Sequence, residues 1–409
     1  MAASSVDVRE LFRLPWTLAD NAMTWLEPTR KCNITCDACF ARNDPASEKS
    51  LSQVEKELDT LLRLRRCDAV LIAGGEPLTH PAIVSITRLV KSRGVKPVLV
   101  TNGVGLTPKL VHDLKQAGAW GITFHVDSHQ DRPGWRGKSE RELNRLRQEF
   151  ADLLYQERGL VCCFNTTVFP DALEQIPDVV EWAVSNVKKV QVLTLIAVRM
   201  ISPEWPFDFY AGGEKVDLSR MPFSSSKTYR NLTAEEIISR VKKVLPDFQL
   251  CAYLGGTSRP HSLKWSIGCR VGTPAATYGW MGPRSMEILQ NVHHFWTGRY
   301  LAYTKPSLSR KARLLFLFGV FDPQVRRALK AYLSAVWRNP RMAFGRIYTQ
   351  TVNILQPIDI LPSGDVDTCD GCPNKTYWNG GLVSACRLDE YAEFGTLLEA
   401  VPRRQEKGR

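Results

Sequence analysis

The sequence predicts an α/β fold, a partial (β/α)6 barrel of the TIM type with a smaller cysteine-rich α+β domain at the C-terminus. Between residues 21 and 200, six short apolar runs typical of strands alternate with five amphipathic runs typical of helices. Such alternation implies a parallel sheet with right-handed crossovers. Six strands are too few to close an eight-stranded barrel, so the barrel is partial. A group of cysteines between residues 369 and 386 predicts the second domain.

The expected strands are rich in β-branched and aliphatic residues and cover Met23–Glu27, Ala69–Ala73, Pro97–Thr101, Gly121–Asp127, Val161–Val168 and Val190–Val198. The expected helices cover Leu51–Leu64, Pro81–Ser92, Pro108–Gln116, Ser139–Tyr155 and Ala172–Val187. Ser50 is a helix-capping residue before the first helix, and Thr107-Pro108 places proline in the first turn of the third. The functional site of such a barrel lies at the carboxyl ends of the strands.

The loop after the first expected strand holds three cysteines, Cys32, Cys36 and Cys39. Thiolates this close together select zinc, copper(I) or an iron–sulfur cluster. Structural zinc normally has four protein ligands, and no further cysteine or histidine follows before Cys67. Three cysteines on a [4Fe–4S] cluster would leave one iron free for a small-molecule ligand. A zinc site completed by a distant residue is the alternative.

The C-x3-C-x2-C spacing resembles that of the radical SAM superfamily. Gly74-Gly75-Glu76-Pro77 resembles the superfamily's GGEP segment after the second strand, and Thr101-Asn102-Gly103 resembles its third-strand TNG motif. The resemblance implies that the three cysteines ligate a [4Fe–4S] cluster whose fourth iron is chelated by S-adenosylmethionine (SAM). It implies reductive cleavage of SAM to a 5′-deoxyadenosyl radical, which abstracts hydrogen from an organic substrate. A reductant such as flavodoxin or ferredoxin would supply the electron.

The same resemblance implies which residues contact SAM: Phe40, Gly74, Gly75, Glu76, Pro77, Asn102, Asp127, Ser128 and Asn165. The glycines would let the backbone approach the methionyl amine closely, and the carboxylate beside them suits an ammonium group. Asp127, Ser128 and Asn165 stand where family members bind the ribose or carboxylate. For Asn102 the alternative role is to turn the chain. The family's usual aromatic residue before the third cysteine is replaced by Ala38, with Phe40 just after the cysteine.

The second cysteine group, Cys369-x2-Cys372-x13-Cys386, predicts an auxiliary [4Fe–4S] cluster. It resembles the C-terminal Twitch and SPASM extensions of radical SAM enzymes. The spacing also matches the second cluster of a molybdenum-cofactor biosynthesis enzyme, but that family's arginine-rich sequence is missing, so its activity is not transferred. The expected fourth ligand is Cys269 or the substrate, and a zinc site built from these four cysteines is the alternative.

Residues 201–349 lose the β-α rhythm and are predicted to form a basic, aromatic-rich, mostly helical insertion between the barrel, 1–200, and the auxiliary domain, 350–409. The formal net charge is +12, and the segment from Arg299 to Arg346 contains a single acid, Asp322. One interpretation is a pair of packed helices with solvated basic faces. The other is a basic amphipathic surface for anionic lipid headgroups or a phosphorylated substrate. Nucleic acid is not favoured, because no nucleic-acid-binding signature is present.

These observations predict a radical SAM oxidoreductase or transferase acting on a small molecule or lipid, with an anionic amphiphile such as an isoprenoid phosphate favoured. The alternatives are a radical SAM enzyme that modifies peptides and a non-catalytic iron–sulfur protein that binds SAM. The first residues lack the apolar core of a secretory signal, and no apolar run reaches the roughly 18–20 residues that span a bilayer. We therefore expect a cytoplasmic protein with peripheral contact to the inner membrane face.

Overall fold

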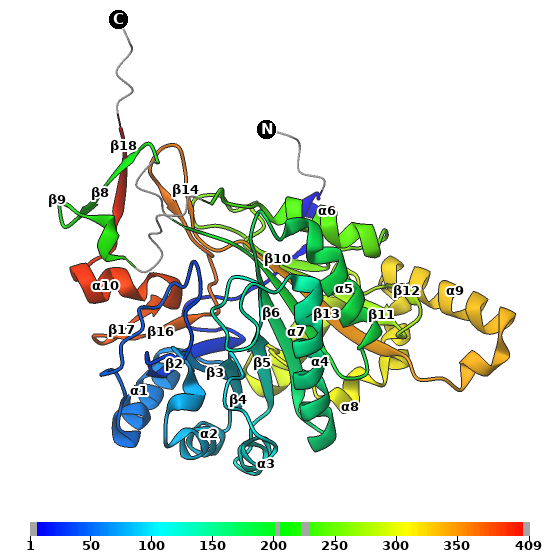
Figure 1. Cartoon of the computed structure of the whole chain (residues 1–409). Coiled ribbons are helices and arrows are strands. Elements are labelled where there is room, and N and C mark those ends of the chain that lie inside the picture. Colours follow the sequence, from blue (N-terminus) through cyan, green and yellow to red (C-terminus); the bar gives the residue numbers. More distant parts are fainter. Residues whose placement is uncertain (1–5, 201–204, 222–228, 404–409) are drawn as a thin grey trace, which may run out of the picture.

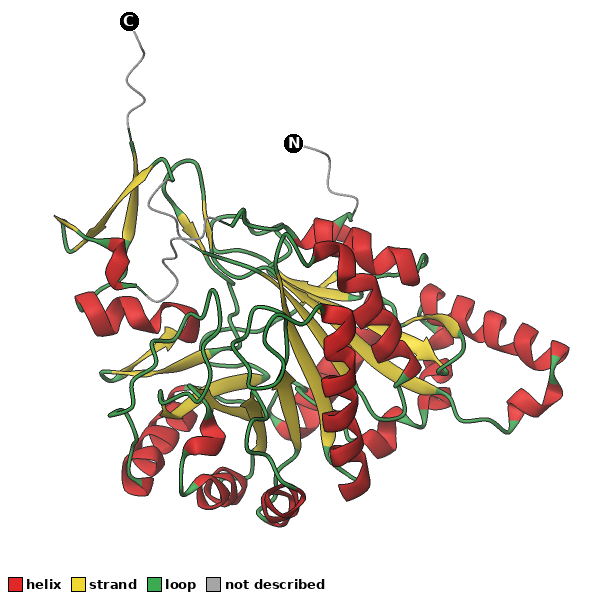
Figure 2. Cartoon of the chain, viewed as in Figure 1, coloured by secondary structure: helices red, strands yellow, loops and turns green. Residues whose placement is uncertain are grey.

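A computed structural model of the chain describes residues 6–200, 205–221 and 229–403. An eleven-stranded sheet forms its centre, with helices packed along the outer face of the barrel strands (Figures 1 and 2). The barrel strands are parallel and lie in chain order: β2 (Met23–Thr29), β3 (Ala69–Gly74), β4 (Lys96–Thr101), β5 (Gly121–His125), β6 (Val161–Val168) and β7 (Val192–Ala197). The connecting helices are α1 (Leu51–Leu64), α2 (Ile83–Ser92), α3 (Pro108–Gln116), α4 (Glu140–Glu157) and α5 (Ile176–Ser185). The predicted partial (β/α)6 barrel is confirmed.

Local signals in the sequence explain where these helices begin. The Ser50 hydroxyl accepts a hydrogen bond from the Gln53 amide, and the Ser50 amide donates one to the Gln53 side chain, a capping box that starts α1. Ser139 starts α4 in the same way. The buried faces of the helices and strands meet in one large apolar core that extends from Leu26 to Ile354. The barrel is therefore a packed body.

Beyond β7 the sheet continues with strands from distant parts of the chain. β13 (Tyr348–Leu355) pairs in parallel with β7, and β11 (Trp265–Gly272) pairs antiparallel with β13. β10 (Ala252–Leu254), β12 (Thr277–Trp280) and β1 (Phe12–Arg13) complete this half. The insertion predicted as mostly helical thus also supplies three strands of the main sheet. Every residue of β11 is buried, so pairing within the sheet, and not local periodicity, fixes its conformation.

The helices of this region are α6 (Ala234–Val244), α7 (Pro283–Thr297), α8 (Pro306–Ser309) and α9 (Pro323–Arg338). Two 3-10 helices, η5 (Ala312–Val320) and η6 (Pro340–Ala343), flank α9, which projects from one end of the molecule (Figure 1). The predicted division into three domains stays a prediction; its second boundary falls within β13. Among the described residues, no helix is both long and apolar enough to cross a membrane.

The C-terminal segment folds back against the first barrel strand and its loop. It contains β14 (Asp359–Ile360), β15 (Val366–Asp367), β16 (Lys375–Trp378), β17 (Gly381–Ser384), α10 (Leu388–Phe394) and β18 (Glu399–Pro402). β18 pairs with β8 (Phe207–Ala211), which pairs with β9 (Glu214–Lys215). The Thr24 hydroxyl donates to the Lys375 carbonyl (2.8 Å), and the Arg42 amide donates to Asp389 (2.7 Å). These contacts hold the second cysteine group beside the first.

Candidate functional site

A cavity of about 650 Å³ opens at the carboxyl ends of the barrel strands. Its wall includes residues from the loops after β2, β3, β4 and β5 and from the ends of β6, β7 and β13. Both cysteine groups face it: the first set is Cys32, Cys36 and Cys39, and the second set is Cys369, Cys372 and Cys386. All six are free thiols. The chain thus brings two sets of three cysteines, separated by more than 300 residues in sequence, to one cavity.

The loop that carries the first set is fixed by the glycine pair at the end of β3. The Gly75 amide donates to the Thr29 carbonyl (3.0 Å), and the Glu76 amide donates to the Lys31 carbonyl (2.8 Å). A Cβ on Gly75 would stand 2.4 Å from the Lys31 oxygen, and Gly74 has a φ of +111°. Only glycines permit this approach and this backbone conformation. The Gly-Gly motif therefore positions the cysteine loop.

Glu76 links the second and third predicted motifs through its carboxylate. Its Oε1 accepts hydrogen bonds from the Thr101 hydroxyl (2.6 Å) and the Leu78 amide (3.0 Å), and its Oε2 accepts one from the Asn102 amide (2.6 Å). The side chain is buried, and burial raises its pKa to about 7 although these hydrogen bonds lower it. Glu76 lines the cavity with its carboxylate already held by the strand ends.

Asn102 connects the loop after β4 to the first cysteine set. Its Nδ2 donates to the Asn33 side-chain oxygen (2.8 Å) and lies 3.9 Å from the Cys32 sulfur. Its Oδ1 accepts from the Val104 amide (2.8 Å), which closes a local turn. Asn102 therefore turns the chain, one of the two roles that the sequence left open, and it also contacts the cysteine loop. Its contact with SAM stays a prediction.

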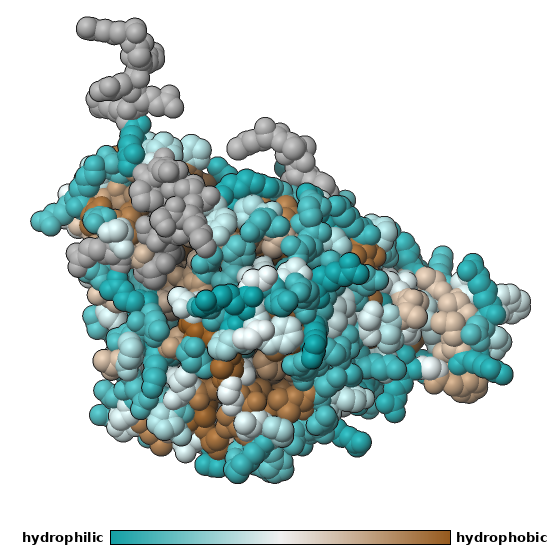
Figure 3. All heavy atoms as spheres, in the orientation of Figure 1, coloured by the Kyte–Doolittle hydropathy of each residue, from teal (hydrophilic) through white to brown (hydrophobic). Residues whose placement is uncertain are grey.

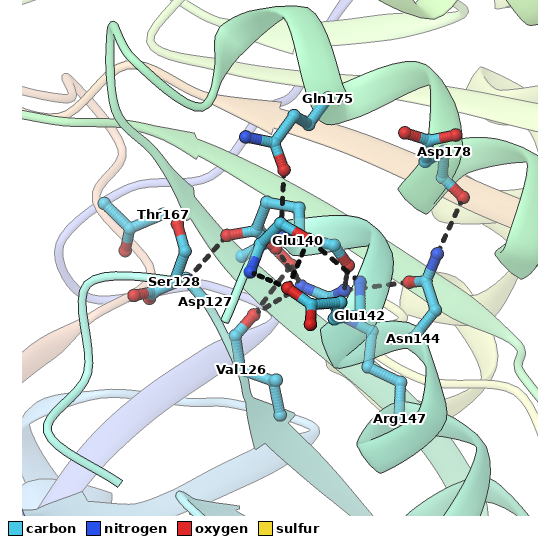
Figure 4. Close-up of polar contacts among 12 residues, drawn as sticks. Val126, Asp127, Ser128, Glu140, Glu142, Asn144, Arg147, Thr167, Gln175 and Asp178 are labelled. Carbon is cyan, nitrogen blue, oxygen red and sulfur yellow. Dashed lines mark hydrogen bonds and ion pairs between the residues drawn. The ribbon is translucent and has the colours of Figure 1, made fainter. Parts of the chain in front are cut away.

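The loop after β5 carries Asp127 and Ser128 and rests on a buried ion pair. Glu140 and Arg147 on α4 are both fully buried and form this pair; the Ser128 amide donates to Glu140 (2.6 Å), and Arg147 donates to the Val126 carbonyl (2.9 Å) (Figure 4). The Asp127 Oδ1 accepts a hydrogen bond from the His129 amide (3.0 Å), and its Oδ2 lies 3.1 Å from the His125 Nε2. Asp127 lines the cavity, and the ion pair holds the backbone of the residues on either side of it.

Most of the residues expected to contact SAM line the cavity: Phe40, Gly74, Gly75, Glu76, Asn102 and Asp127. Pro77, Ser128 and Asn165 do not. Pro77 begins the 3-10 helix η2 (Pro77–Thr79). Asn165 lies on β6 two residues before Thr167, which does line the cavity and bonds the His125 ring (3.0 Å). Residues two apart on a strand share a face, so Asn165 and Thr167 lie on the same side of β6. Thr167 is the one of the two that reaches the cavity.

Sequence reasoning also missed Arg132, a buried cation behind the cavity wall. Its guanidinium donates to the Asn102 carbonyl (2.6 Å) and to the His125 carbonyl (3.1 Å). Burial lowers the pKa of Arg132, and burial raises the pKa of the Cys36 thiol while the Arg132 charge opposes that rise. Arg132 lies in the loop between β5 and α4, and neither a motif nor a periodic pattern marks it in the sequence.

The second cysteine set is held by a buried arginine at the end of α1. Arg65 donates to the Cys372 carbonyl (2.7 Å), and its side chain is fully buried. The pKa of Cys372 is lowered to about 6, first by a hydrogen bond with the Cys369 thiol and also by nearby cations. Burial raises the pKa of Cys386 to about 12. Within the set, the pKa of one thiol is thus lowered and the pKa of the other two is raised.

Lys264 adds a buried positive charge to the same wall of the cavity. Its ammonium lies 2.5 Å from Asp359 and 3.1 Å from Asp367. The hydrogen bond with Cys372 and burial raise the pKa of Cys369, and the charge of Lys264 opposes that rise. Arg199, which pairs with Asp359 (2.8 Å), lines the cavity as well. The sequence offered no signal for this network, because its members come from three separate segments.

The structure does not bring Cys269 to the second set. Cys269 lies within β11 opposite Thr351, in the apolar cluster that also contains Cys251. Cys369 forms an isolated β-bridge with Gly256. Gly256 follows Leu254, which pairs with Trp265 at the start of β11, so Cys369 lies beyond that end of the strand. Trp265 and Cys269 are four positions apart on the strand, a distance of about 13 Å at the usual rise of ~3.3 Å per residue. Burial in the middle of the sheet keeps this thiol away from the cavity.

The donor chemistry of both sets suits an iron–sulfur cluster, since thiolates are its usual protein ligands. In the described part of the chain, no three Cys, His, Asp or Glu side chains lie close enough together to hold a single metal ion.

Comparison with known proteins identifies the domain. Residues 26–183 match the model of the Radical SAM superfamily, a stretch that runs from β2 into α5 and includes the first cysteine set. The chain therefore contains a radical SAM domain, a domain type that uses a [4Fe–4S] cluster and SAM.

Two relatives match parts of the chain. The AdoMet-dependent heme synthase of Methanosarcina barkeri is 31% identical over 176 residues, which are 41% of this chain and 48% of the relative. The GTP 3′,8-cyclase of Chlorobaculum tepidum is 28% identical over 140 residues, 34% of this chain and 42% of the relative. The chain thus spans less than half the length of either. Streptococcus suis SuiB bound to S-adenosylmethionine aligns with a TM-score of 0.37 and 18% identity over 56% of this chain and 48% of SuiB.

Proposed function

We propose that this chain, with its radical SAM domain, is a radical SAM oxidoreductase or transferase that holds its [4Fe–4S] cluster through Cys32, Cys36 and Cys39. The observation that supports this most strongly is the position of the three thiols. They line one cavity at the carboxyl ends of the strands, beside the Gly75 and Asn102 loops. When bound, the cluster supplies the electron that cleaves SAM to methionine and a 5′-deoxyadenosyl radical.

The residues around the first set would bind and orient SAM. The backbone of Gly74 and Gly75 gives close access to the methionyl amine, and Phe40 and Asp127 are the cavity side chains available to the nucleoside. Glu76 acts as a positioning residue, because its three hydrogen bonds fix both loops. Pro77, Ser128 and Asn165 would support these contacts from behind, by their places in η2, the β5 loop and β6.

We further propose that Cys369, Cys372 and Cys386 hold an auxiliary [4Fe–4S] cluster of the Twitch or SPASM kind. The three thiols face the same cavity, and Arg65 and Lys264 lie beside them. Because Cys269 is buried in the middle of β11 and does not line the cavity, the remaining position falls to the substrate or to solvent.

The cavity wall favours an anionic amphiphile, a lipid or an isoprenoid phosphate, as substrate. Aromatic and aliphatic side chains line part of it: Trp205, Phe209, Trp265, Ile196, Met200 and Leu355. Cationic side chains line another part, each of them beside a carboxylate: Arg30, Arg42, Arg199 and Lys264. Apolar surface would bury a hydrocarbon chain, and cations suit a phosphate. A peptide is the second candidate substrate. Flavodoxin or ferredoxin would act as reductant, and the enzyme would contact the inner membrane face peripherally.

Anaerobic SAM cleavage tests this function. Reconstituted and reduced wild-type protein should form methionine and 5′-deoxyadenosine, and Cys39→Ser should lower the rate at least ~100-fold because a cluster ligand is lost. Cys67→Ala, which removes a buried thiol outside the cavity, is the matched control. Full activity in the serine variants of all three first-set cysteines would overturn the proposal, and absence of both products from wild type would favour the non-catalytic SAM-binding alternative. Stimulation by an isoprenoid phosphate, but not by a peptide, would support the substrate class.

A further inference from the structure

The segment from residue 312 to residue 344, called here the helical arm, consists of η5, α9 and η6 and turns large apolar side chains outward. These exposed side chains are Leu314, Leu317, Val320, Phe321, Leu333, Trp337 and Phe344. Trp337 is 88% exposed and Phe344 is 90% exposed. The inner face of α9 is nevertheless well packed, with Val325, Ala328 and Tyr332 buried. The outward apolar residues are therefore surplus to folding, and contiguous surfaces of this kind mark interaction sites.

The charges of the arm all have one sign at its surface. Six cations are exposed: Arg313, Arg326, Arg327, Lys330, Arg338 and Arg341. The single acid, Asp322, is fully buried and caps α9 by accepting from the Gln324 and Val325 amides (2.9 and 3.2 Å). Within the described ranges, no carboxylate forms an ion pair with any of the six cations. An anionic partner would therefore meet uncompensated positive charge.

Cations and apolar residues share one flank of α9. Arg326, Lys330, Leu333 and Trp337 follow one another at spacings of four, three and four residues, which places them in one row along the helix. On the face seen in Figure 3, the projecting part of the molecule shows a moderately hydrophobic area with hydrophilic residues beside it. Helices that lie in a bilayer interface combine these residue types, with cations at the lipid phosphates and aromatic rings at headgroup depth.

We infer that the helical arm docks the protein peripherally on an anionic lipid bilayer. The six exposed cations, none of which pairs with a carboxylate in the described part of the chain, complement anionic headgroups. Trp337 and Phe344, the two most exposed aromatic side chains of the arm, enter the interface. None of the residues that line the cavity belongs to the arm, so this surface is separate from the site of chemistry. The inference names the surface responsible for the proposed membrane contact and does not depend on SAM cleavage.

Vesicle flotation of the full chain tests the inference. Wild-type protein should bind vesicles of phosphatidylcholine with 30% phosphatidylglycerol, should not bind pure phosphatidylcholine, and should dissociate in high salt, where charges are screened within about 3 Å at 1 M. The triple variant Arg327→Gln, Lys330→Gln, Arg338→Gln should bind roughly 100-fold more weakly, since each cation near an anionic surface contributes about fivefold. Trp337→Ser with Phe344→Ser should also weaken binding.

A matched triple variant, Lys56→Gln, Arg88→Gln, Lys188→Gln, removes the same charge from exposed positions outside the arm and should bind as wild type does. An equal loss of vesicle binding in the two triple variants would show that only the net charge of the protein matters, and it would overturn the inference. Wild-type protein that does not bind anionic vesicles would overturn it as well. A change of oligomeric state in the Trp337 and Phe344 variant, with vesicle binding intact, would assign the surface to a second copy of the chain instead. Lipid-free SAM cleavage, measured in parallel, should be the same in all variants, which separates this test from that of the proposed function.

Discussion

Replacing Glu76 with glutamine should remove a pH-dependent component of stability from the centre of the site. Burial raises the pKa of Glu76 to about 7 from an ordinary value of 4.5. The folded protein therefore binds this proton more tightly than the unfolded chain does. The stabilisation is fully present below the unfolded value and is lost as pH rises through 7. With ~1.4 kcal/mol per pKa unit, the loss between pH 5 and pH 8 amounts to roughly 2–3 kcal/mol.

The assay is equilibrium denaturation of apoprotein at several pH values between 5 and 8, compared between wild type and Glu76→Gln. Other titrating groups are common to both proteins, so their contributions cancel in the difference. The advantage of wild type should shrink by roughly 2–3 kcal/mol across this range. The amide also leaves at least one buried N–H without an acceptor, a cost of about 1–3 kcal/mol that does not vary with pH. A difference that is constant, or that grows as pH rises, would refute the reasoning.

Glu142→Gln provides a control of opposite sign. Glu142 caps the start of α4, and its hydrogen bonds with Lys138 and Ser139 lower its pKa to about 2. The stability that it contributes is present above the unfolded value and is lost as pH falls through the folded one. The difference in unfolding free energy between wild type and Glu142→Gln should therefore stay constant between pH 6 and pH 8.

Three further predictions concern the supports of the site. Glu140→Gln should cost about 3–5 kcal/mol of unfolding free energy because it leaves Arg147 charged and buried, whereas Glu140→Leu with Arg147→Met should recover most of that loss in the same denaturation assay. Gly75→Ala should lower the iron bound at the first cysteine set by more than half, since its Cβ would overlap the backbone of the cysteine loop at 2.4 Å, as iron analysis would show. Arg65→Met should cost about 1–3 kcal/mol and weaken iron binding at the second set alone, because the Cys372 carbonyl loses its donor.

Each of these has a clear contrary outcome. A Glu140→Gln variant within about 1 kcal/mol of wild type would show that the buried pair does not support the loop. Full iron content in Gly75→Ala would mean that the glycine is dispensable for the cysteine loop. Iron lost equally from both sets in Arg65→Met would indicate general unfolding.

Local patterns in the sequence predicted the barrel well. The bounds of α1, α3 and β6 agree with the structure to the residue. Ser50 and Thr107 cap the starts of the two helices, and a valine stands at each end of the strand. The predicted strand Val190–Val198 is shortened to Val192–Ala197, and Pro81–Ser92 begins at Ile83 instead. Ends without a capping side chain carry no such local signal.

Pairing between distant segments was beyond the sequence. Nothing local indicates that β13 lies between β7 and β11, or that the Asp389 carboxylate holds the backbone of the first cysteine loop. For the same reason, only some of the residues around the two cysteine sets could be predicted from the sequence. Motifs with fixed spacing identified Glu76 and Asn102, whereas Arg132 and Lys264 reach the site only through tertiary structure.

Iron and sulfide analysis of three reconstituted proteins tests the central claim, that two three-cysteine sets at one cavity each hold a [4Fe–4S] cluster. Wild type should contain about eight irons per chain, and serine replacement of either complete set should leave about four, with the cluster's Mössbauer signature retained in both variants. SAM-dependent spectral change should persist only in the variant that keeps Cys32, Cys36 and Cys39. Iron content that is unchanged by replacement of either set, or zinc in place of iron, would contradict the account.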